Sequence, residues 1–446
     1  MKKISALFLC CVVMLTASGC SFTLSPQELY SLPKLPTEYV ELDDRINAIL
    51  AEGAEYAAPI SGTNIQPVQL VDLNGDGQEE AVTFFRNTSE EKPLKICIFT
   101  AKDQNYEQTA VIESSGTGIY SIAYHDLNND GYTELIVGWR ATTDQQALAV
   151  YTLRSGEPME LMRTNYVRYA ITDLDQDHSS ELVVLRAADE ENGSVADYYS
   201  WQTGELQMRT SARISITMAQ LSQQGRVTSG TLQGGVPALF VTGVVDSAWA
   251  ITDILTLKNG ELTNIVLSDV TGVSREIAPF RSLYPTDING DGITEVPVPV
   301  ALPDWGDDED STQKRIDWHA YDEAGDGITV MSTYHDIEDG WYLRLPKDWK
   351  DQISVSRSVI PDEAYVTFYI QGDTGLQPIL RITAITGNSR STKAVRSGRF
   401  TLSRQAETTF TAELLEANSS WTYGLTEDEV REAFSLITKE WFYGDY

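Results

Sequence analysis

The sequence Asp72-Leu-Asn-Gly-Asp-Gly-Gln-Glu-Glu80 has oxygen-bearing side chains at its first, third, fifth and ninth positions. Three further segments repeat this arrangement: Asp126-Leu-Asn-Asn-Asp-Gly-Tyr-Thr-Glu134, Asp173-Leu-Asp-Gln-Asp-His-Ser-Ser-Glu181 and Asp287-Ile-Asn-Gly-Asp-Gly-Ile-Thr-Glu295. Each copy is followed at once by an apolar run that is typical of a buried strand, such as residues 135–139. These four segments determine both the predicted fold and the predicted site.

Alternating oxygen donors in a tight turn suit Ca²⁺, because this hard cation takes about six to eight oxygen ligands. A site for a softer metal would need Cys or His. Glycine at the sixth position permits the positive φ that wraps a loop around an ion, and His178 takes this place in the third copy, which we expect to be the weakest site. The predicted calcium ligands are Asp72, Asn74, Asp76, Glu80, Asp126, Asn128, Asp130, Glu134, Asp173, Asp175, Asp177, Glu181, Asp287, Asn289, Asp291 and Glu295.

Two alternative interpretations fit the repeat less well. An EF-hand requires a glutamate at position 12 and flanking helices, whereas position 12 here lies inside a strand-like run and is Thr or Val. Simple Asn-Gly and Asp-Gly turns explain the glycines but not the regularly spaced glutamate. Calcium at a turn between two strands is therefore the favoured prediction, with a structural rather than a catalytic role.

The spacing of the copies indicates the architecture. They begin at residues 72, 126, 173 and 287, so the intervals are 54, 47 and 114 residues. The long interval leaves room for a degenerate copy, which we place at residues 220–228 and expect to fold without metal. Repeats of about 40 to 60 residues with about four strands each are typical of β-propeller blades.

The four motifs resemble the VCBS/FG-GAP repeats of integrin α-subunit propellers and of many bacterial surface proteins. The resemblance covers residues 60–340 and implies a calcium-binding β-propeller. The family usually has Asp at position 9, where this sequence has Glu. Its propellers often have seven blades, but about five repeat units can be counted here, so a five-bladed ring and an irregular larger one both stay open.

The N-terminal residues predict export and anchoring. Lys2 and Lys3 precede an apolar run over residues 4–15, which is followed by small residues and Cys20. This segment resembles a bacterial lipobox, although Ala17 stands where Leu is usual. We therefore predict a signal peptide over residues 1–19, lipid on Cys20 and an extracytoplasmic protein anchored to the bacterial cell membrane. An ordinary secreted protein is the alternative.

Four further segments complete the predicted organisation. Residues 20–36 read as a tether, and residues 37–58 as an amphipathic helix that docks on the first blade. The mainly β propeller spans residues 59–340, and residues 341–446 form a small α+β domain with a faint resemblance to PsbP/Mog1-like domains. A capping box of Thr426 and Glu429 predicts a final helix with an apolar stripe, formed by Val430, Ala433, Phe434, Ile437 and Trp441.

Composition and motifs limit the function. Lys and Arg total 33 against 65 Asp and Glu, a net charge of −32 that argues against nucleic acid as a partner. The sequence contains no His-Glu-x-x-His, Gly-x-Ser-x-Gly, Walker or Rossmann pattern, so no catalytic residue is predicted. We expect a binding or adhesion module for an unknown protein or glycan. A polysaccharide hydrolase or lyase that uses carboxylates of the propeller face, and a purely structural envelope protein, are the alternatives.

Overall fold

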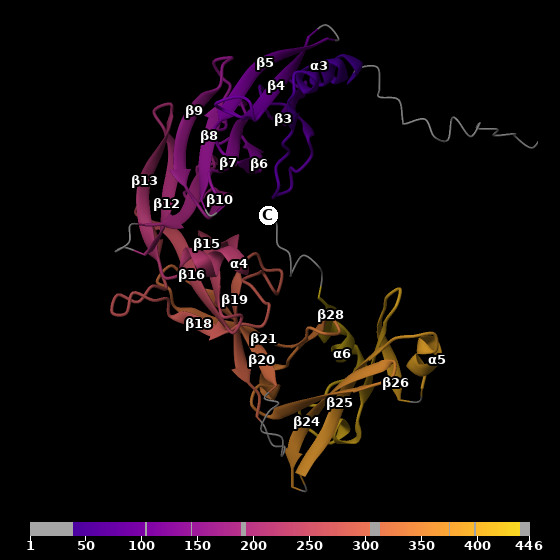
Figure 1. Ribbon diagram of the computed structural model, residues 1–446. Helices are drawn as coiled ribbons and strands as arrows, with labels where there is room; N and C mark the ends of the chain where they lie inside the picture. Colours follow the sequence, from indigo (N-terminus) through magenta and orange to yellow (C-terminus); the bar gives the residue numbers. More distant parts are fainter. Residues whose placement is uncertain are drawn as a thin grey trace, which may run out of the picture.

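The computed structural model describes residues 39–102, 105–143, 145–188, 193–303, 313–373, 375–396 and 398–437. The predicted signal peptide, Cys20 and the tether lie outside these residues. The described chain forms six antiparallel sheets that follow one another along an arc (Figure 1). We call the first five sheets blades 1 to 5, and the sixth the C-terminal sheet.

Each blade contains four or five strands. Blade 1 is built from β1 (Glu55–Tyr56), β2 (Val68–Val71), β3 (Glu80–Arg86), β4 (Leu94–Lys102) and β5 (Asn105–Ser114). Blade 2 is built from β6 (Gly118–His125), β7 (Glu134–Arg140), β8 (Gln146–Thr152) and β9 (Met159–Asn165). Blade 3 is built from β10 (Arg168–Thr172), β11 (Glu181–Ala187), β12 (Ser194–Gln202) and β13 (Glu205–Ile214).

The later sheets continue this pattern. Blade 4 is built from β14 (Arg226–Thr231), β15 (Pro237–Val245), β16 (Trp249–Lys258), β17 (Glu261–Asn264) and β18 (Glu276–Pro279). Blade 5 is built from β19 (Glu295–Ala301), β20 (Lys314–Tyr321), β21 (Gly327–Asp336), β22 (Trp341–Arg344) and β28 (Phe434–Leu436). The C-terminal sheet has the order β23 (Ile353–Ile360), β24 (Glu363–Gly372), β25 (Gly375–Ile385), β27 (Thr409–Leu414) and β26 (Arg399–Arg404).

Short helices connect or cover these sheets. The α-helices are α3 (Val40–Ala51), α4 (Met218–Gln223), α5 (Arg390–Ala394) and α6 (Glu427–Ala433). Two 3₁₀ turns, η2 (Lys347–Trp349) and η3 (Glu416–Ser419), accompany the C-terminal sheet. The chain is thus mainly β, with propeller-type blades followed by a small α+β unit, as predicted.

The strands that follow loops 1, 2 and 3 are mostly apolar on both faces because these blades are packed on both sides. In β11, Leu182 and Val184 join the core shared with blade 2, whereas Val183 and Leu185 join the core shared with blade 4. Successive side chains of a strand point to opposite faces, so a sheet between two others needs no polar face. This explains why the strands after the four motifs read as continuous hydrophobic runs.

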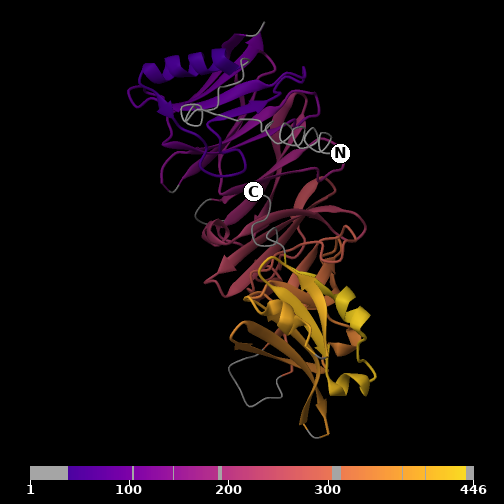
Figure 2. The ribbon, with the colours of Figure 1, turned by 90° about the vertical axis from the view of Figure 1, so that its right-hand side faces the viewer.

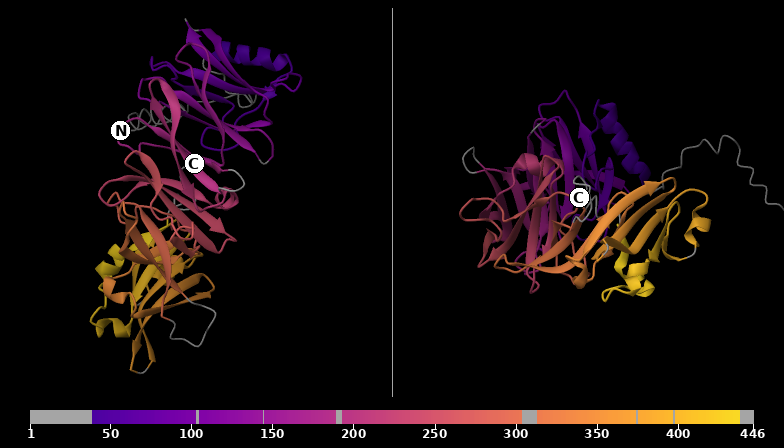
Figure 3. Two further views of the ribbon diagram at one scale, coloured as in Figure 1. Left: turned by 90° about the vertical axis from the view of Figure 1, so that its left-hand side faces the viewer. Right: turned by 90° about the horizontal axis from the view of Figure 1, so that it is seen from below.

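The blades form an open arc rather than a closed ring. Helix α3 packs Leu42 and Ile46 against Phe85 and Phe99, on the face of blade 1 opposite blade 2. In a closed ring the last blade would occupy this face. Figures 2 and 3 show α3 at one end of the molecule and the yellow C-terminal unit near the other. A helix packs on blade 1 as expected, but it spans Val40–Ala51 and not residues 37–58, because Glu55–Tyr56 pairs with β3 as β1. Its position on this face is consistent with an arc that stays open.

The C-terminal unit differs from the prediction in two details. The boundary expected at Gly340 falls in the turn of the β21–β22 hairpin, so Trp341–Arg344 belongs to blade 5. The capping box of Thr426 and Glu429 is present, but α6 ends at Ala433, and Phe434 begins the strand β28 on β22. The expected helical stripe through Phe434 and Ile437 is therefore wrong, because pairing with the edge of blade 5 replaces the last turns. Trp441 lies outside the described residues.

Candidate metal sites

The four motifs form loops at equivalent places in the blades. Loop 1 (residues 72–80) joins β2 to β3, loop 2 (126–134) joins β6 to β7, loop 3 (173–181) joins β10 to β11, and loop 5 (287–295) precedes β19. In loops 1, 2 and 3 the apolar residue at position 2 is buried in a core shared with the next blade, whereas Ile288 of loop 5 is buried in a cluster within blade 5. Leu73 lies between blades 1 and 2, Leu127 between blades 2 and 3, and Leu174 between blades 3 and 4. The shape of each of these loops therefore affects a contact between blades.

The acidic and amide side chains hold each loop in one shape. The carboxylate at position 1 accepts a hydrogen bond from the backbone N–H of position 6, at 2.9, 2.8, 3.1 and 2.8 Å in loops 1, 2, 3 and 5. Position 3 accepts from the N–H of position 5, and position 5 accepts from the N–H of position 7, in all four loops. In loops 1, 2 and 5 the other oxygen of the position 1 carboxylate also accepts a backbone N–H, whereas in loop 3 it does not. A carboxylate oxygen has two lone pairs, so oxygens that already accept one bond can still meet another partner.

Position 6 has a positive φ in every loop. The angle is 84° at Gly77, 88° at Gly131, 75° at His178 and 84° at Gly292. The expectation that His178 adopts the glycine-like conformation is confirmed. All four loops therefore turn in the same way, although only three have the glycine.

The glutamate at position 9 has a role that the sequence analysis missed. Its carboxylate accepts a hydrogen bond from the backbone N–H of position 2, at 2.9 Å from Leu73, 3.0 Å from Leu127, 2.8 Å from Leu174 and 3.1 Å from Ile288. This bond fastens the start of the loop to the start of the next strand. The only signal in the sequence was the Glu in place of the usual Asp, since the longer side chain reaches across the loop.

Burial makes the charge on these glutamates unfavourable. Glu134, Glu181 and Glu295 are at most 2% exposed, and burial raises the pKa of each from 4.5 to about 7. The N–H bond from position 2 lowers the pKa, but the neighbouring Asp carboxylates raise it further. Burial also raises the pKa of Glu80. A cation in the loop would favour the ionised form of these side chains.

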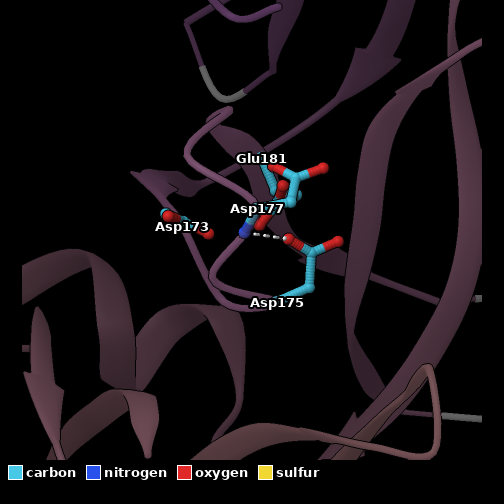
Figure 4. Close-up of side chains that lie close together, drawn as sticks. All are labelled: Asp173, Asp175, Asp177 and Glu181. Carbon is cyan, nitrogen blue, oxygen red and sulfur yellow. Dashed lines mark hydrogen bonds between the residues drawn. The ribbon is translucent and has the colours of Figure 1, made fainter.

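Loop 3 brings four carboxylates together. One oxygen from each of Asp173, Asp175, Asp177 and Glu181 can be chosen so that all lie within 4.8 Å of one another. Figure 4 shows the four side chains around the turn, with the bond from the Asp177 N–H to Asp175. Oδ1 of Asp173 is buried and has no hydrogen-bond partner. An unsatisfied carboxylate oxygen beside three other carboxylates is suited to a hard cation.

The other three loops differ because position 3 is Asn. Its amide donates to a neighbouring carboxylate: Asn74 to Glu80 at 3.1 Å, Asn128 to Asp130 at 3.1 Å and Asn289 to Asp291 at 2.9 Å. These donors partly satisfy the carboxylates, whereas Asp175 in loop 3 cannot donate when ionised. Loop 3 thus has the largest uncompensated negative charge, although the sequence analysis expected it to be the weakest site.

Neighbouring loops touch one another across the blades. The backbone N–H of Thr133 in loop 2 donates to the carbonyl of Leu73 at 3.0 Å, and its hydroxyl donates to the carbonyl of Asp72 at 3.1 Å. The N–H of Ser180 in loop 3 donates to the carbonyl of Leu127 at 3.1 Å. Gly75 lies so close to the Gly131 carbonyl that a Cβ atom would overlap it. Loops 1, 2 and 3 therefore form a connected row.

The degenerate copy predicted at residues 220–228 is wrong. Residues 218–223 form α4, which begins with a capping box between Thr217 and Gln220 and buries Leu221 in the core of blades 3 and 4. The true equivalent of the loops in blade 4 is the short turn between β14 and β15. There Leu232 fills the apolar position, and its N–H donates to the Val236 carbonyl at 2.7 Å instead of to a glutamate.

Tryptophan rings can stack on sugars, and those of the described residues differ in exposure. Trp139 and Trp318 are 1% and 0% exposed and belong to the core. Trp249 is 50% exposed, and Trp201 lines a cavity beside loop 2.

Cys97 is buried, and burial raises the pKa of its thiol to about 11, which keeps it in the unreactive thiol form.

The comparisons with known proteins support the repeat. The sequence model of a family described as FG-GAP-like repeat matches residues 72–137, which include loops 1 and 2 and reach into β7. The resemblance to FG-GAP repeats is thus confirmed for this segment. No curated protein matches the chain.

Two solved structures are similar at low identity. The rhamnogalacturonan lyase YesW is 12% identical with a TM-score of 0.30, over 73% of this chain and 68% of that chain. The Dos1 propeller is 9% identical with a TM-score of 0.23, over 80% of this chain and 81% of that chain. In the described part of the chain, no helix is long and apolar enough to span a membrane.

Proposed function

We propose that this protein is an extracytoplasmic binding module, anchored to the bacterial cell membrane by lipid on Cys20, whose blades are stiffened by calcium. The ligand is a protein or a glycan. The observation that carries the proposal is the shared geometry of the four loops. In each loop the same backbone bonds orient the carboxylates, and the apolar residue at position 2 is buried in the core.

Calcium acts in this proposal as a structural ion. When bound, the ion supplies positive charge to the carboxylate oxygens that the backbone does not use. In loops 1, 2 and 3 the loop then holds position 2 in the core between two blades, so that ion binding would stabilise the contact between neighbouring blades. In loop 5 it would hold Ile288 in the core of blade 5. Loop 3 binds most tightly, because its four carboxylates converge and Oδ1 of Asp173 has no other partner.

Calcium binding is tested by equilibrium dialysis and by thermal unfolding. The purified protein takes up calcium at up to four sites, and its melting temperature rises with calcium by mass action. Asp173→Ala lowers calcium uptake by one ion per chain. It also removes the largest part of the rise in melting temperature that calcium causes. Asp246→Ala, which removes a carboxylate outside the loops, leaves both unchanged. If the wild-type protein binds no calcium at millimolar concentration, the proposal is wrong.

Anchoring and ligand binding need separate measurements. Cys20→Ser moves the protein from the membrane fraction to the released fraction, whereas Cys97→Ser does not. A glycan array and cross-linking in the native envelope then identify the ligand class. Binding without turnover supports the proposed module, and release of new sugar ends from a bound polysaccharide would instead identify a hydrolase or lyase.

A further inference from the structure

A cavity of about 180 Å³ lies between blades 2 and 3, next to loop 2. Its walls come from three loop residues, from the turn that follows β8, and from the end of β12 with its turn. They include Asn128, Asp130, Thr152, Arg154, Met159 and Trp201. A cavity of about 150 Å³ is enough to hold one six-membered ring, so this space fits one ring-sized ligand.

Trp201 is placed firmly at the wall of this cavity. The strands β12 and β13 are joined by a two-residue turn in which Thr203 and Gly204 have φ of 50° and 87°. Two positive φ values define the type I′ turn that matches the twist of a hairpin. One side of Trp201 packs on the core shared by blades 2 and 3, and the side chain is only partly buried. An aromatic ring therefore borders the cavity without having to move.

Polar groups line the same cavity. Arg154 donates to Oδ2 of Asp130 at 2.9 Å, and the side chain of Asn128 donates to the same oxygen at 3.1 Å. Among the described residues, Asp130 is the only proposed calcium ligand that forms an ion pair with a basic side chain. An aromatic ring together with a few polar groups is the usual composition of a site for a small polar ligand.

The local charge makes this cavity dependent on the ion in loop 2. Asp126, Asp130 and Glu134 contribute three carboxyl groups, and among the described residues Arg154 is the only basic side chain paired with them. The excess of carboxyl groups disfavours an acidic ligand and holds Arg154 on Asp130. Calcium held by these side chains would neutralise the carboxylates and would leave the donors of Arg154 available to a ligand.

We propose that this cavity binds one pyranose residue of a glycan, stacked on Trp201 and hydrogen-bonded by Arg154, in a calcium-dependent manner. This inference rests on the proposed function, because it requires calcium in loop 2. It goes beyond that function by assigning the ligand class and the residues that contact it. A pyranose has an apolar C–H face for the aromatic ring and hydroxyl groups for the guanidinium, and both neutral and acidic sugars share this chemistry.

The first test measures sugar binding to the full chain with calcium, by saturation-transfer NMR and by titration. The probes are methyl galactoside, methyl glucoside and galacturonate. Trp201→Ala is expected to lower affinity roughly tenfold or more, and Trp201→Phe by less, since it keeps a ring. Trp249→Ala removes an exposed tryptophan that lines no described cavity and should bind like wild type. If only galacturonate binds, the ligand of the cavity is an acidic sugar. If a neutral glycoside binds, the ligand is a neutral sugar.

The second test separates the ion from the cavity wall. Asp126 is a proposed ligand of loop 2 but does not line the cavity, so Asp126→Ala should abolish sugar binding by removing the ion. Asp72→Ala changes the same position of loop 1 and should leave sugar binding intact. A cooperative melting transition in calcium, which still rises with calcium, shows that Trp201→Ala is folded even if the lost packing lowers its melting temperature.

Two results would overturn the inference. One is the failure of all three sugars to bind in a way that depends on Trp201, and the other is equal binding by Asp126→Ala or by the chelated protein. Calcium uptake is measured in the same samples. Uptake without sugar binding refutes the cavity assignment alone, whereas absence of calcium uptake refutes the proposed function itself.

Discussion

Raising the pH of the calcium-free protein should weaken its fold through the glutamates at position 9. The pKa of Glu134, Glu181 and Glu295 is raised by burial from 4.5 to about 7 in the folded protein. A raised pKa means that the folded state holds the proton more tightly than the unfolded state. The contribution to stability is therefore fully present below about pH 4.5, falls as the pH rises, and is lost above about pH 7.

The expected size follows from the shift. At about 1.4 kcal/mol per pH unit, a rise from 4.5 to about 7 corresponds to about 3 kcal/mol for each fully buried glutamate. Buried histidines act in the opposite direction: burial lowers the pKa of His335 to about 3 and also lowers that of His125 and His319, so their contribution grows with pH. The total pH dependence thus combines both groups, and a single-site variant is needed to isolate one glutamate.

Glu181→Gln is that variant. Glutamine keeps an acceptor for the Leu174 N–H, which Glu181 binds at 2.8 Å, but it cannot ionise. Urea unfolding in EDTA is compared at about pH 5 and about pH 8. The loss of stability between the two pH values should be smaller in Glu181→Gln than in wild type by about 3 kcal/mol. Glu205→Gln, at the exposed first residue of β13 in the same blade, should behave as wild type.

Calcium should also change how the free energy of unfolding depends on pH. Because the ion replaces the proton as the partner of the carboxylate, added calcium stabilises the wild-type protein more at about pH 8 than at about pH 5. If wild type and Glu181→Gln lose the same stability between the two pH values in EDTA, ionisation of Glu181 does not destabilise the fold. The prediction would then be wrong.

Three further changes test the loops and the end of the arc by thermal unfolding. Gly75→Ala should lower the free energy of unfolding by about 1 to 3 kcal/mol more than Gly290→Ala does. Both glycines have positive φ, but only Gly75 lies against the neighbouring loop. Equal losses of stability would contradict this contact. His178→Gly should stabilise the protein by about 1 kcal/mol, by relieving the left-handed conformation, and a loss would show that the imidazole itself is needed. Leu42→Ala should cost about 2 to 5 kcal/mol and promote aggregation of blade 1, whereas Val40→Ala, at an exposed position of the same helix, should not.

Local patterns in the sequence predicted much of the fold correctly. The motif, its glycine and the following apolar run are all within about fifteen residues, and the strand expected at residues 135–139 is found as Glu134–Arg140. The capping box at Thr426 marks the start of α6. A similar short-range signal, Thr217 with Gln220, was available for α4 but was not used, so a helix was interpreted as a degenerate loop. The end of α6 could not be predicted in this way, because pairing of Phe434 with a distant strand ends the helix.

The four loops, their strands and the oxygen donors could be predicted from the sequence, because each depends on residues that are neighbours in the chain. The open arc could not be predicted, since it depends on α3 covering the face of Phe85. The same holds for the loop that gathers the most carboxylates and for the cavity that is lined by both Trp201 of blade 3 and Arg154 of blade 2. Such contacts join residues far apart in sequence, and their spacing along the chain contains no information about their separation in space.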